Sequence, residues 1–204
     1  MFSHTQFLVC KINVLIVYAH PNPNSFNHAI LDSVVTGLKQ ADHTPKIKDL
    51  YTLSLKITLD AEDFEQIANG KTPDDILKEQ QDILWAEGLI FIYPIWWYDC
   101  PAILKGWIDR VFLQGFAFDI DADGIKGLLM HKKAIIFQTT GGTEAMFTHI
   151  GTDKDVLRHT MMESTLQFCG IQNIIYKPFY GVPYISQADR EQMLSETYEL
   201  AKNF

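Results

Sequence analysis

The stretch INVLIVYA, residues Ile12–Ala19, decides the fold. It is apolar and rich in β-branched residues, which is typical of a parallel strand buried on both faces. The loop His20–Asn27, HPNPNSFN, follows it directly and is rich in proline and asparagine. Apolar residues at helical spacing then predict a helix to about Gln40, with Asn24 or Ser25 as its N-cap. Strand, loop and helix together form the first unit of an α/β protein.

The same alternation of strands and helices continues to the end of the chain. Apolar and β-branched runs predict four further strands, at about Pro45–Asp49, Gly88–Pro94, Ala134–Thr139 and Gln172–Phe179. Helices are expected at about Ala61–Ala68, Pro73–Trp85, Pro101–Leu113, Asp153–Phe168 and Gln187–Lys202. This pattern predicts an α/β fold with a doubly wound, five-stranded parallel sheet and helices on both faces. No repeat or linker divides residues 1–204, so we interpret them as a single domain with an N-terminal extension over 1–11.

The composition argues against several classes of protein. A net charge of −8 is unfavourable for a general nucleic-acid binder, which needs a basic surface to meet phosphates. Cys10, Cys100 and Cys169 are far apart and form no CxxC pair, so neither a disulfide framework nor a metal site is expected. Free thiols fit a reducing, cytoplasmic location. No stretch approaches the ~18 apolar residues of a membrane-spanning helix, and no convincing signal peptide is present, so we expect no membrane insertion.

Three loops at the carboxyl ends of the predicted strands have the composition of a ligand site, because doubly wound sheets bind ligands at that edge. The first is His20–Asn27. Free backbone N–H groups at the helix start suit a phosphate, and His20, Ser25 and Asn27 add side-chain donors. An ordinary capped helix would use the same residue types. Neither GxGxxG nor GxxxxGK[ST] occurs, so a common dinucleotide or nucleoside-triphosphate loop is not indicated.

The other two loops suit a flat ring. Pro94–Tyr98, PIWWY, places three aromatic side chains after a buried strand, where they could cover a ring or pack into the core. Thr139–Thr143, TTGGT, allows close approach of the backbone to a ligand, although it could also be a plain Gly-Gly turn. Anion donors, aromatic cover and close backbone approach on one sheet edge predict a ring cofactor that carries a phosphate.

Several of these stretches resemble the NAD(P)H:quinone oxidoreductase, or DT-diaphorase-like, family of the flavodoxin-like fold, in particular its shorter bacterial members. The matching stretches are Val17–Ile30, Phe91–Phe112, Thr139–Gly142 and Phe168–Gly170. The resemblance implies a strand order of 2-1-3-4-5 among the five parallel strands. It also implies FAD as cofactor, with FMN possible, and NAD(P)H as co-substrate.

The resemblance also assigns positions around the flavin. Those near the phosphate are His20, Ser25, Phe26, Asn27 and Ala29. Those along the isoalloxazine ring are Pro94, Ile95, Trp96, Trp97 and Tyr98 on one flank and Thr139, Thr140, Gly141 and Gly142 on the other. Arg190, with Leu194, matches the adenine end of FAD, although a solvated helix arginine is the alternative. The implied substrate pocket comprises Trp97, Tyr98, Phe118 and Phe147.

The chain departs from the family pattern where a tyrosine and a histidine stabilise the reduced flavin. Phe147 occupies the tyrosine position, and His149 is the nearest histidine to the other. The catalytic groups we expect are therefore the backbone N–H groups of Gly141 and Gly142, together with His149 as proton donor.

The resemblance implies ping-pong hydride transfer from NAD(P)H through the flavin to a quinone-type acceptor. It also implies a homodimer with its active site at the interface, to which the stretches Ser54–Pro73 and Phe112–Phe118 could contribute. Two alternatives stay open: an electron-carrier flavodoxin, and a regulatory subunit with a potassium-efflux transporter as partner. The same flavin chemistry would also serve an azo- or nitroreductase.

Overall fold

The computed structural model describes residues 11–149 and 156–204. Five strands form one parallel sheet in the order β2-β1-β3-β6-β7. Their bounds are β1 Asn13–Tyr18, β2 Thr44–Asp49, β3 Gly88–Pro94, β6 Lys133–Thr139 and β7 Ile174–Phe179. Counted without β4 and β5, which lie outside this sheet, the order is 2-1-3-4-5. The predicted sheet and its strand order are confirmed.

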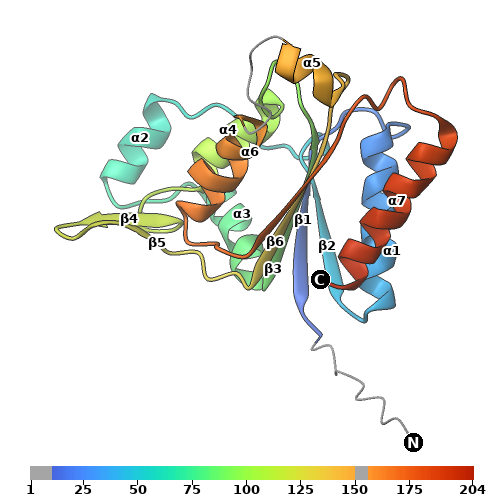
Figure 1. Ribbon diagram of the computed structural model, residues 1–204. Helices are drawn as coiled ribbons and strands as arrows, with labels where there is room; N and C mark the ends of the chain where they lie inside the picture. Colours follow the sequence, from blue (N-terminus) through green and yellow to red (C-terminus); the bar gives the residue numbers. More distant parts are fainter. Residues whose placement is uncertain (1–10, 150–155) are drawn as a thin grey trace, which may run out of the picture.

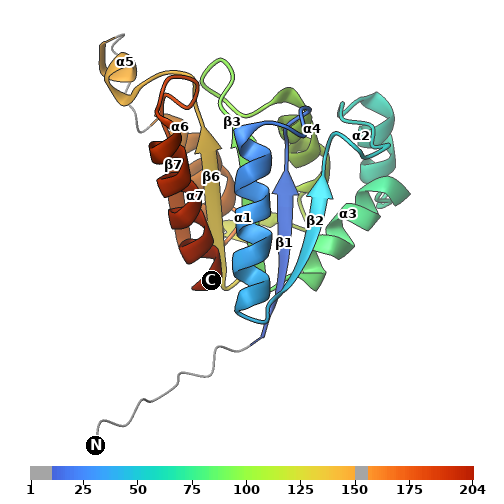
Figure 2. The same cartoon turned by 90° about the vertical axis from the view of Figure 1, so that its right-hand side faces the viewer.

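Helices cover both faces of this sheet, as expected (Figures 1 and 2). On one face lie α1 (Phe26–Gln40) and α7 (Gln187–Lys202), which pack against each other. On the other lie α3 (Asp74–Trp85), α4 (Ala102–Val111) and the helical segment α6–η1. Each face therefore has its own apolar core, and the central strands β1, β3 and β6 are buried almost throughout. Double burial explains why these strands are continuous apolar runs.

Three elements differ from the expectation. A short antiparallel hairpin, β4 (Phe118–Asp121) and β5 (Gly124–Gly127), lies outside the sheet, and α5 spans Glu144–His149. The helix expected from about Asp153 is a short α6 (Val156–Arg158) followed by a π-helix, η1 (His159–Gln167); residues 150–155 lie outside the described part. The Thr165 hydroxyl donates to the Thr160 carbonyl at 2.8 Å, a five-residue span that suits the wider π turn.

Arg110 ties α2 (Ala61–Ala68) and α3 to α4. Arg110 is 1% exposed, and its guanidinium donates to both carboxylate oxygens of Asp63, at 3.1 and 2.9 Å, and to Asp75. It also donates to the Lys56 carbonyl at 2.7 Å, which fixes the chain leading into α2. Buried charges persist in proteins when they are paired in this way. The segment between β2 and α3 is therefore anchored by this ion-pair network as well as by the packing of Leu50, Leu53 and Leu55 against the core.

Gly106 is the point at which α4 touches this anchored segment. A methyl group at Gly106 would overlap the carbonyl oxygen of Ile57, a backbone atom that cannot rotate away. We expect Gly106→Ala to destabilise the protein by about 1–3 kcal/mol, the usual range for overpacking. Urea unfolding would measure the change in the free energy of unfolding. Ala102→Gly, at the exposed start of α4, is the control for a change in helix propensity alone. If Gly106→Ala were as stable as wild type, the close approach of Gly106 to the Ile57 carbonyl would be contradicted.

No helix within residues 11–149 and 156–204 has the length and apolar character needed to cross a membrane.

Candidate active site

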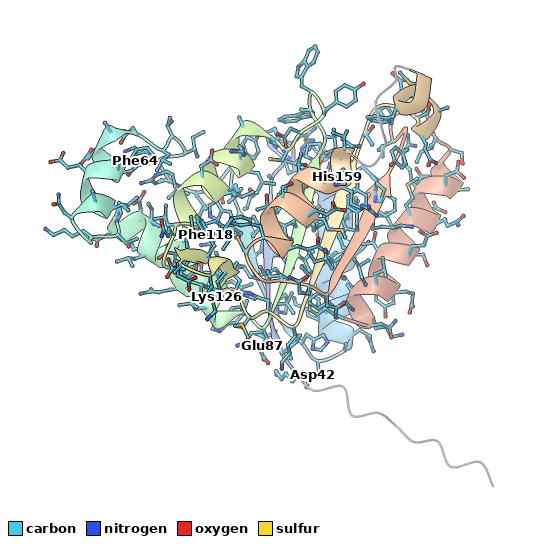
Figure 3. All side chains as sticks on the ribbon, turned by 60° about the vertical axis from the view of Figure 1, so that its left-hand side comes forward. Asp42, Phe64, Glu87, Phe118, Lys126 and His159 are labelled. Carbon is cyan, nitrogen blue, oxygen red and sulfur yellow. The ribbon has the colours of Figure 1, made fainter. Side chains whose placement is uncertain are left out.

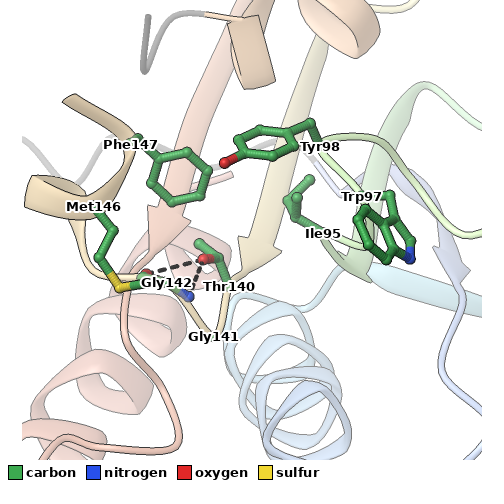
Figure 4. Close-up of a pocket in the computed structure, with 8 residues that line it drawn as sticks. All are labelled: Ile95, Trp97, Tyr98, Thr140, Gly141, Gly142, Met146 and Phe147. Carbon is green, nitrogen blue, oxygen red and sulfur yellow. Dashed lines mark hydrogen bonds between the residues drawn. The ribbon is translucent and has the colours of Figure 1, made fainter. Parts of the chain in front are cut away.

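A crevice with two adjoining cavities opens where β1, β3 and β6 end. The larger cavity measures 510 Å³ and is lined by His20, Ser25, Phe26, Asn27, Pro94, Ile95, Trp96, Trp97, Thr139, Thr140, Gly141, Val182 and Pro183. The smaller measures 350 Å³ and is lined by Ile95, Trp97, Tyr98, Thr140, Gly141, Gly142, Met146 and Phe147 (Figure 4). The two share four residues: Ile95, Trp97, Thr140 and Gly141. All three loops selected from the sequence therefore meet in one site.

The loop between β1 and α1 offers hydrogen-bond donors to the larger cavity. The Ser25 side chain caps α1 by accepting from the His28 amide at 3.2 Å. Within the described residues, no hydrogen bond is found for the amides of Phe26 and Asn27, which open the helix. His20 Nδ1 accepts from the Asn22 amide at 3.1 Å, so the proton of the neutral ring is on Nε2. Burial lowers the pKa of His20 and favours this neutral form.

Asn27 links the first loop to the end of β6. Its side chain is 3% exposed, and Nδ2 donates to the Thr139 hydroxyl at 2.7 Å. Its Oδ1 is buried without a hydrogen-bond partner beside the larger cavity. A buried amide with unused hydrogen-bonding capacity is uncommon in the interior of a protein, and it is expected where a ligand completes the site.

The loop after β3 makes a tight turn with two residues in the left-handed region. Trp96 and Asp99 exchange backbone hydrogen bonds of 3.0 and 3.2 Å, and between them Trp97 and Tyr98 have φ values of 53° and 64°. Glycine and asparagine occupy such positions most easily, so two aromatic residues there store strain. Trp97 is 97% exposed at the mouth of the crevice. The turn therefore presents its aromatic side chains at the crevice rather than packing them into a core.

In the loop after β6, one of the two glycines, Gly142, is hydrogen-bonded within the loop itself. Thr140 Oγ1 accepts from the Gly142 amide and donates to the Gly142 carbonyl, both at 2.9 Å (Figure 4). The expected donor at Gly142 is therefore occupied by Thr140. For the Gly141 amide no partner is found in the described part of the chain. A Cβ on Gly141 would meet no protein atom within 4 Å, so the crevice is open directly above its backbone.

Known proteins share this architecture. The flavodoxin-like fold family matches residues 12–201. Ribosyldihydronicotinamide dehydrogenase (quinone) of Homo sapiens is 34% identical to this chain, and the match covers 89% of this chain and 87% of the human protein. A solved NAD(P)H:quinone oxidoreductase from Methanothermobacter marburgensis is 31% identical, with a TM-score of 0.84 and coverage of 95% and 97% of the two chains. The chain belongs to the NAD(P)H:quinone oxidoreductase family. An FMN-dependent NADH-azoreductase of Bacillus anthracis, solved with FMN, shares the fold, with a TM-score of 0.75 at 19% identity. The match covers 94% of this chain and 98% of the azoreductase chain.

Most positions that the family resemblance assigned to the flavin line one of the two cavities. The exceptions are Ala29, half-buried in the first turn of α1, Arg190, and Leu194, which packs against the core. Arg190 donates to the Val182 carbonyl at 3.0 Å from the first turn of α7. The Val182 amide donates in turn to the Thr140 carbonyl at 3.1 Å. Arg190 therefore holds the wall formed by Val182 and Pro183 rather than lining the crevice itself.

Of the four residues expected in the substrate pocket, Trp97, Tyr98 and Phe147 line the smaller cavity, whereas Phe118 does not. Phe147, buried on α5, lies edge to face against Tyr98 with ring centroids 5.4 Å apart. Phe118 packs against Phe168 at 5.1 Å on the hairpin side of the molecule (Figure 3), and it lines neither cavity of its own chain. The hairpin, which the sequence did not predict, carries Phe118 away from the crevice. His149 ends α5, and its side chain lies outside the described part of the structure.

Three lining residues were not expected: Met146, Val182 and Pro183. Val182 and Pro183 follow β7, so their position after a fifth parallel strand could have revealed them. Met146 belongs to α5, a six-residue helix with no distinctive sequence pattern. No signal in the sequence would have placed it at the crevice.

Proposed function

We propose that the protein is a flavin-dependent oxidoreductase that takes hydride from NAD(P)H and passes it to a quinone-type acceptor. The observation that carries the proposal is the pair of adjoining cavities. The larger has polar groups of His20, Ser25 and Asn27 at its α1 end, and the smaller is lined mainly by apolar side chains. The first suits a phosphate-bearing ring cofactor, and the second suits a flat apolar reactant placed against it.

The protein's own residues would bind and orient the reactants. The free amides at the start of α1 and Nε2 of His20 would hold the phosphate, while Trp97 and the Gly141 backbone would enclose the ring from opposite sides. The Gly141 amide is the uncommitted donor for charge that develops on the ring, and Thr140 holds the loop in place. When bound, the flavin supplies the two-electron chemistry.

We propose FAD as the flavin, with Arg190 beside the adenine end, as the family resemblance implies. The supporting observation is that Arg190 fixes the loop containing Val182 and Pro183, which forms one wall of the larger cavity. FMN, which ends at the phosphate, would need the ring loops and the start of α1 but not the region beside Arg190. Chromatography of the released flavin distinguishes the two.

We also propose a homodimer with the active site completed across the interface. The hairpin β4–β5 exposes Ile120 and Ile125 to solvent and carries Phe118 away from the crevice of its own chain. A second chain could bring this hairpin to the smaller cavity. Sedimentation of a fully active monomer would contradict the dimer.

Steady-state kinetics test the proposed function. Initial rates would be measured with varied NADH or NADPH at several fixed concentrations of menadione, after reconstitution with FAD. We expect parallel double-reciprocal lines, because donor and acceptor would occupy the same cavity in turn. Flavin-loaded protein that consumes neither nucleotide would contradict the function, and intersecting lines would contradict the shared cavity.

A further inference from the structure

The smaller cavity contains one side-chain hydroxyl that the protein does not use. We propose that Tyr98 is a catalytic residue: its phenol donates a hydrogen bond, and then a proton, to a carbonyl oxygen of the acceptor. This inference rests on the proposed function and assigns a proton donor to the same site. The acceptors it selects are those with a carbonyl group on a flat ring.

The polar groups of this cavity are few. Of its eight lining residues, Thr140 and Tyr98 have hydroxyl groups. Both hydrogen-bonding capacities of the Thr140 hydroxyl are taken by Gly142, at 2.9 Å each. No hydrogen bond of the Tyr98 hydroxyl is found anywhere in the described chain, and Figure 4 shows this oxygen directed toward Phe147 across the cavity. Tyr98 is therefore the free hydroxyl donor in a mainly apolar cavity.

The surroundings hold the Tyr98 ring in place. Tyr98 meets Phe147 edge to face at 5.4 Å with an interplanar angle of 89°, and Phe147 meets Tyr180 in the same way at 5.8 Å. Its own backbone is in the left-handed region, with φ of 64°. Strained residues of this kind gather where the surrounding structure needs one particular side-chain direction. The strained turn and the aromatic contact together fix the hydroxyl at the cavity.

The chemistry of the acceptor explains what this hydroxyl would do. A quinone becomes a hydroquinone by gaining two electrons and two protons. One proton arrives with both electrons as hydride, which NAD(P)H loses. The second would come from the Tyr98 O–H bond and protonate the other carbonyl oxygen. Tyr98 is 37% exposed, so water at the mouth of the crevice can return the proton to the phenolate. In an apolar cavity such a donor acts more strongly than in water.

The test is Tyr98→Phe, which keeps the ring and its contact with Phe147 but removes the hydroxyl. The holoenzyme would be assayed with NADH or NADPH and two acceptors: menadione, which takes protons, and ferricyanide, which takes single electrons without protons. We expect kcat/KM for menadione to fall by about 10-fold, the effect of one hydrogen bond. The rate with ferricyanide should not change, and the solvent deuterium isotope effect on menadione reduction should disappear.

Tyr184→Phe is the matched control, because Tyr184 is 80% exposed and lines neither cavity. It should behave like wild type with both acceptors. Equal losses of Tyr98→Phe with menadione and ferricyanide would overturn the proposal, because they would assign Tyr98 to cofactor or nucleotide binding. An unchanged isotope effect would also overturn it. Wild-type protein inactive with both acceptors would contradict the proposed function itself, which is a separate outcome.

Discussion

Replacement of Arg110 by methionine is expected to destabilise the protein by about 3–5 kcal/mol, the usual cost of removing one partner from a buried ion pair. Methionine keeps much of the apolar volume of the side chain, so the loss would come mainly from the charge. Asp63 is 2% exposed; it would lose both hydrogen bonds from Arg110 and keep only one ion pair, with Lys56 at 3.3 Å. Urea unfolding would measure the change in the free energy of unfolding.

Lys105→Met is the matched control on the same helix. Lys105 pairs with Asp109 one turn away, but both side chains are largely exposed. Exposed pairs of this kind contribute at most about 1 kcal/mol. Similar losses for the two variants would contradict the special role of the buried network.

The same network makes a prediction for acid stability. The hydrogen bonds from Arg110 lower the pKa of Asp63 to about 2. A carboxyl group with a lowered pKa stabilises the fold above its unfolded pKa of about 3.9, and this stabilisation is lost as the pH falls toward the folded value. Wild type should therefore lose stability between about pH 4 and pH 2. Arg110→Met should lose less over this interval, and an identical pH dependence in both proteins would contradict the assignment.

Gly141→Val is expected to weaken flavin binding by about 10-fold to 100-fold, equivalent to about 1–3 kcal/mol of overpacking. A side chain on Gly141 would enter the crevice where we place the flat ring. The free energy of unfolding without flavin should hardly change, because a Cβ there meets no protein atom within 4 Å and Gly141 does not have a positive φ. Fluorescence titration with FAD and FMN would measure the affinity, and apoprotein unfolding the stability.

Two further variants make this test specific. Gly141→Ala should show a smaller loss than Gly141→Val, because it adds a single carbon to the crevice. Thr143→Val changes the same loop outside both cavities and should bind flavin like wild type. Flavin affinity that Gly141→Val leaves intact would place the ring elsewhere.

The sheet could be predicted from the sequence because of how its strands are buried. β1, β3 and β6 have core on both faces, so each contains a run of at least four consecutive apolar residues. The hairpin β4–β5 could not be predicted in the same way, because most of its residues, Ile120 and Ile125 among them, are exposed and form no apolar pattern. The π-helix η1 could not be predicted either, because over nine residues the spacing of apolar side chains is too similar in an α-helix and a π-helix to distinguish them. The difference depends on contacts such as the hydrogen bond from the Thr165 hydroxyl to the Thr160 carbonyl.

The site was predictable as a place but not in its hydrogen bonds. Three loops at the carboxyl ends of parallel strands must share one edge of the sheet, and their cavities are contiguous. The engagement of the Gly142 amide by Thr140 depends on a side-chain rotamer, which the sequence does not encode visibly. The contact of Arg190 with Val182 depends on how α7 packs after β7. Local composition therefore located the crevice, whereas tertiary packing decides which of its donors remain free.

The central claim is that the crevice holds a flavin that NAD(P)H reduces. The most direct measurement is an anaerobic titration of the flavin-loaded protein with NADH and, separately, NADPH, while the visible flavin absorption is recorded. We predict complete bleaching in one two-electron step with at least one of the nucleotides, and return of the yellow colour when menadione is added. A protein that binds flavin but stays oxidised with both nucleotides would contradict the account. A long-lived semiquinone during reductive titration would favour the electron-carrier alternative instead.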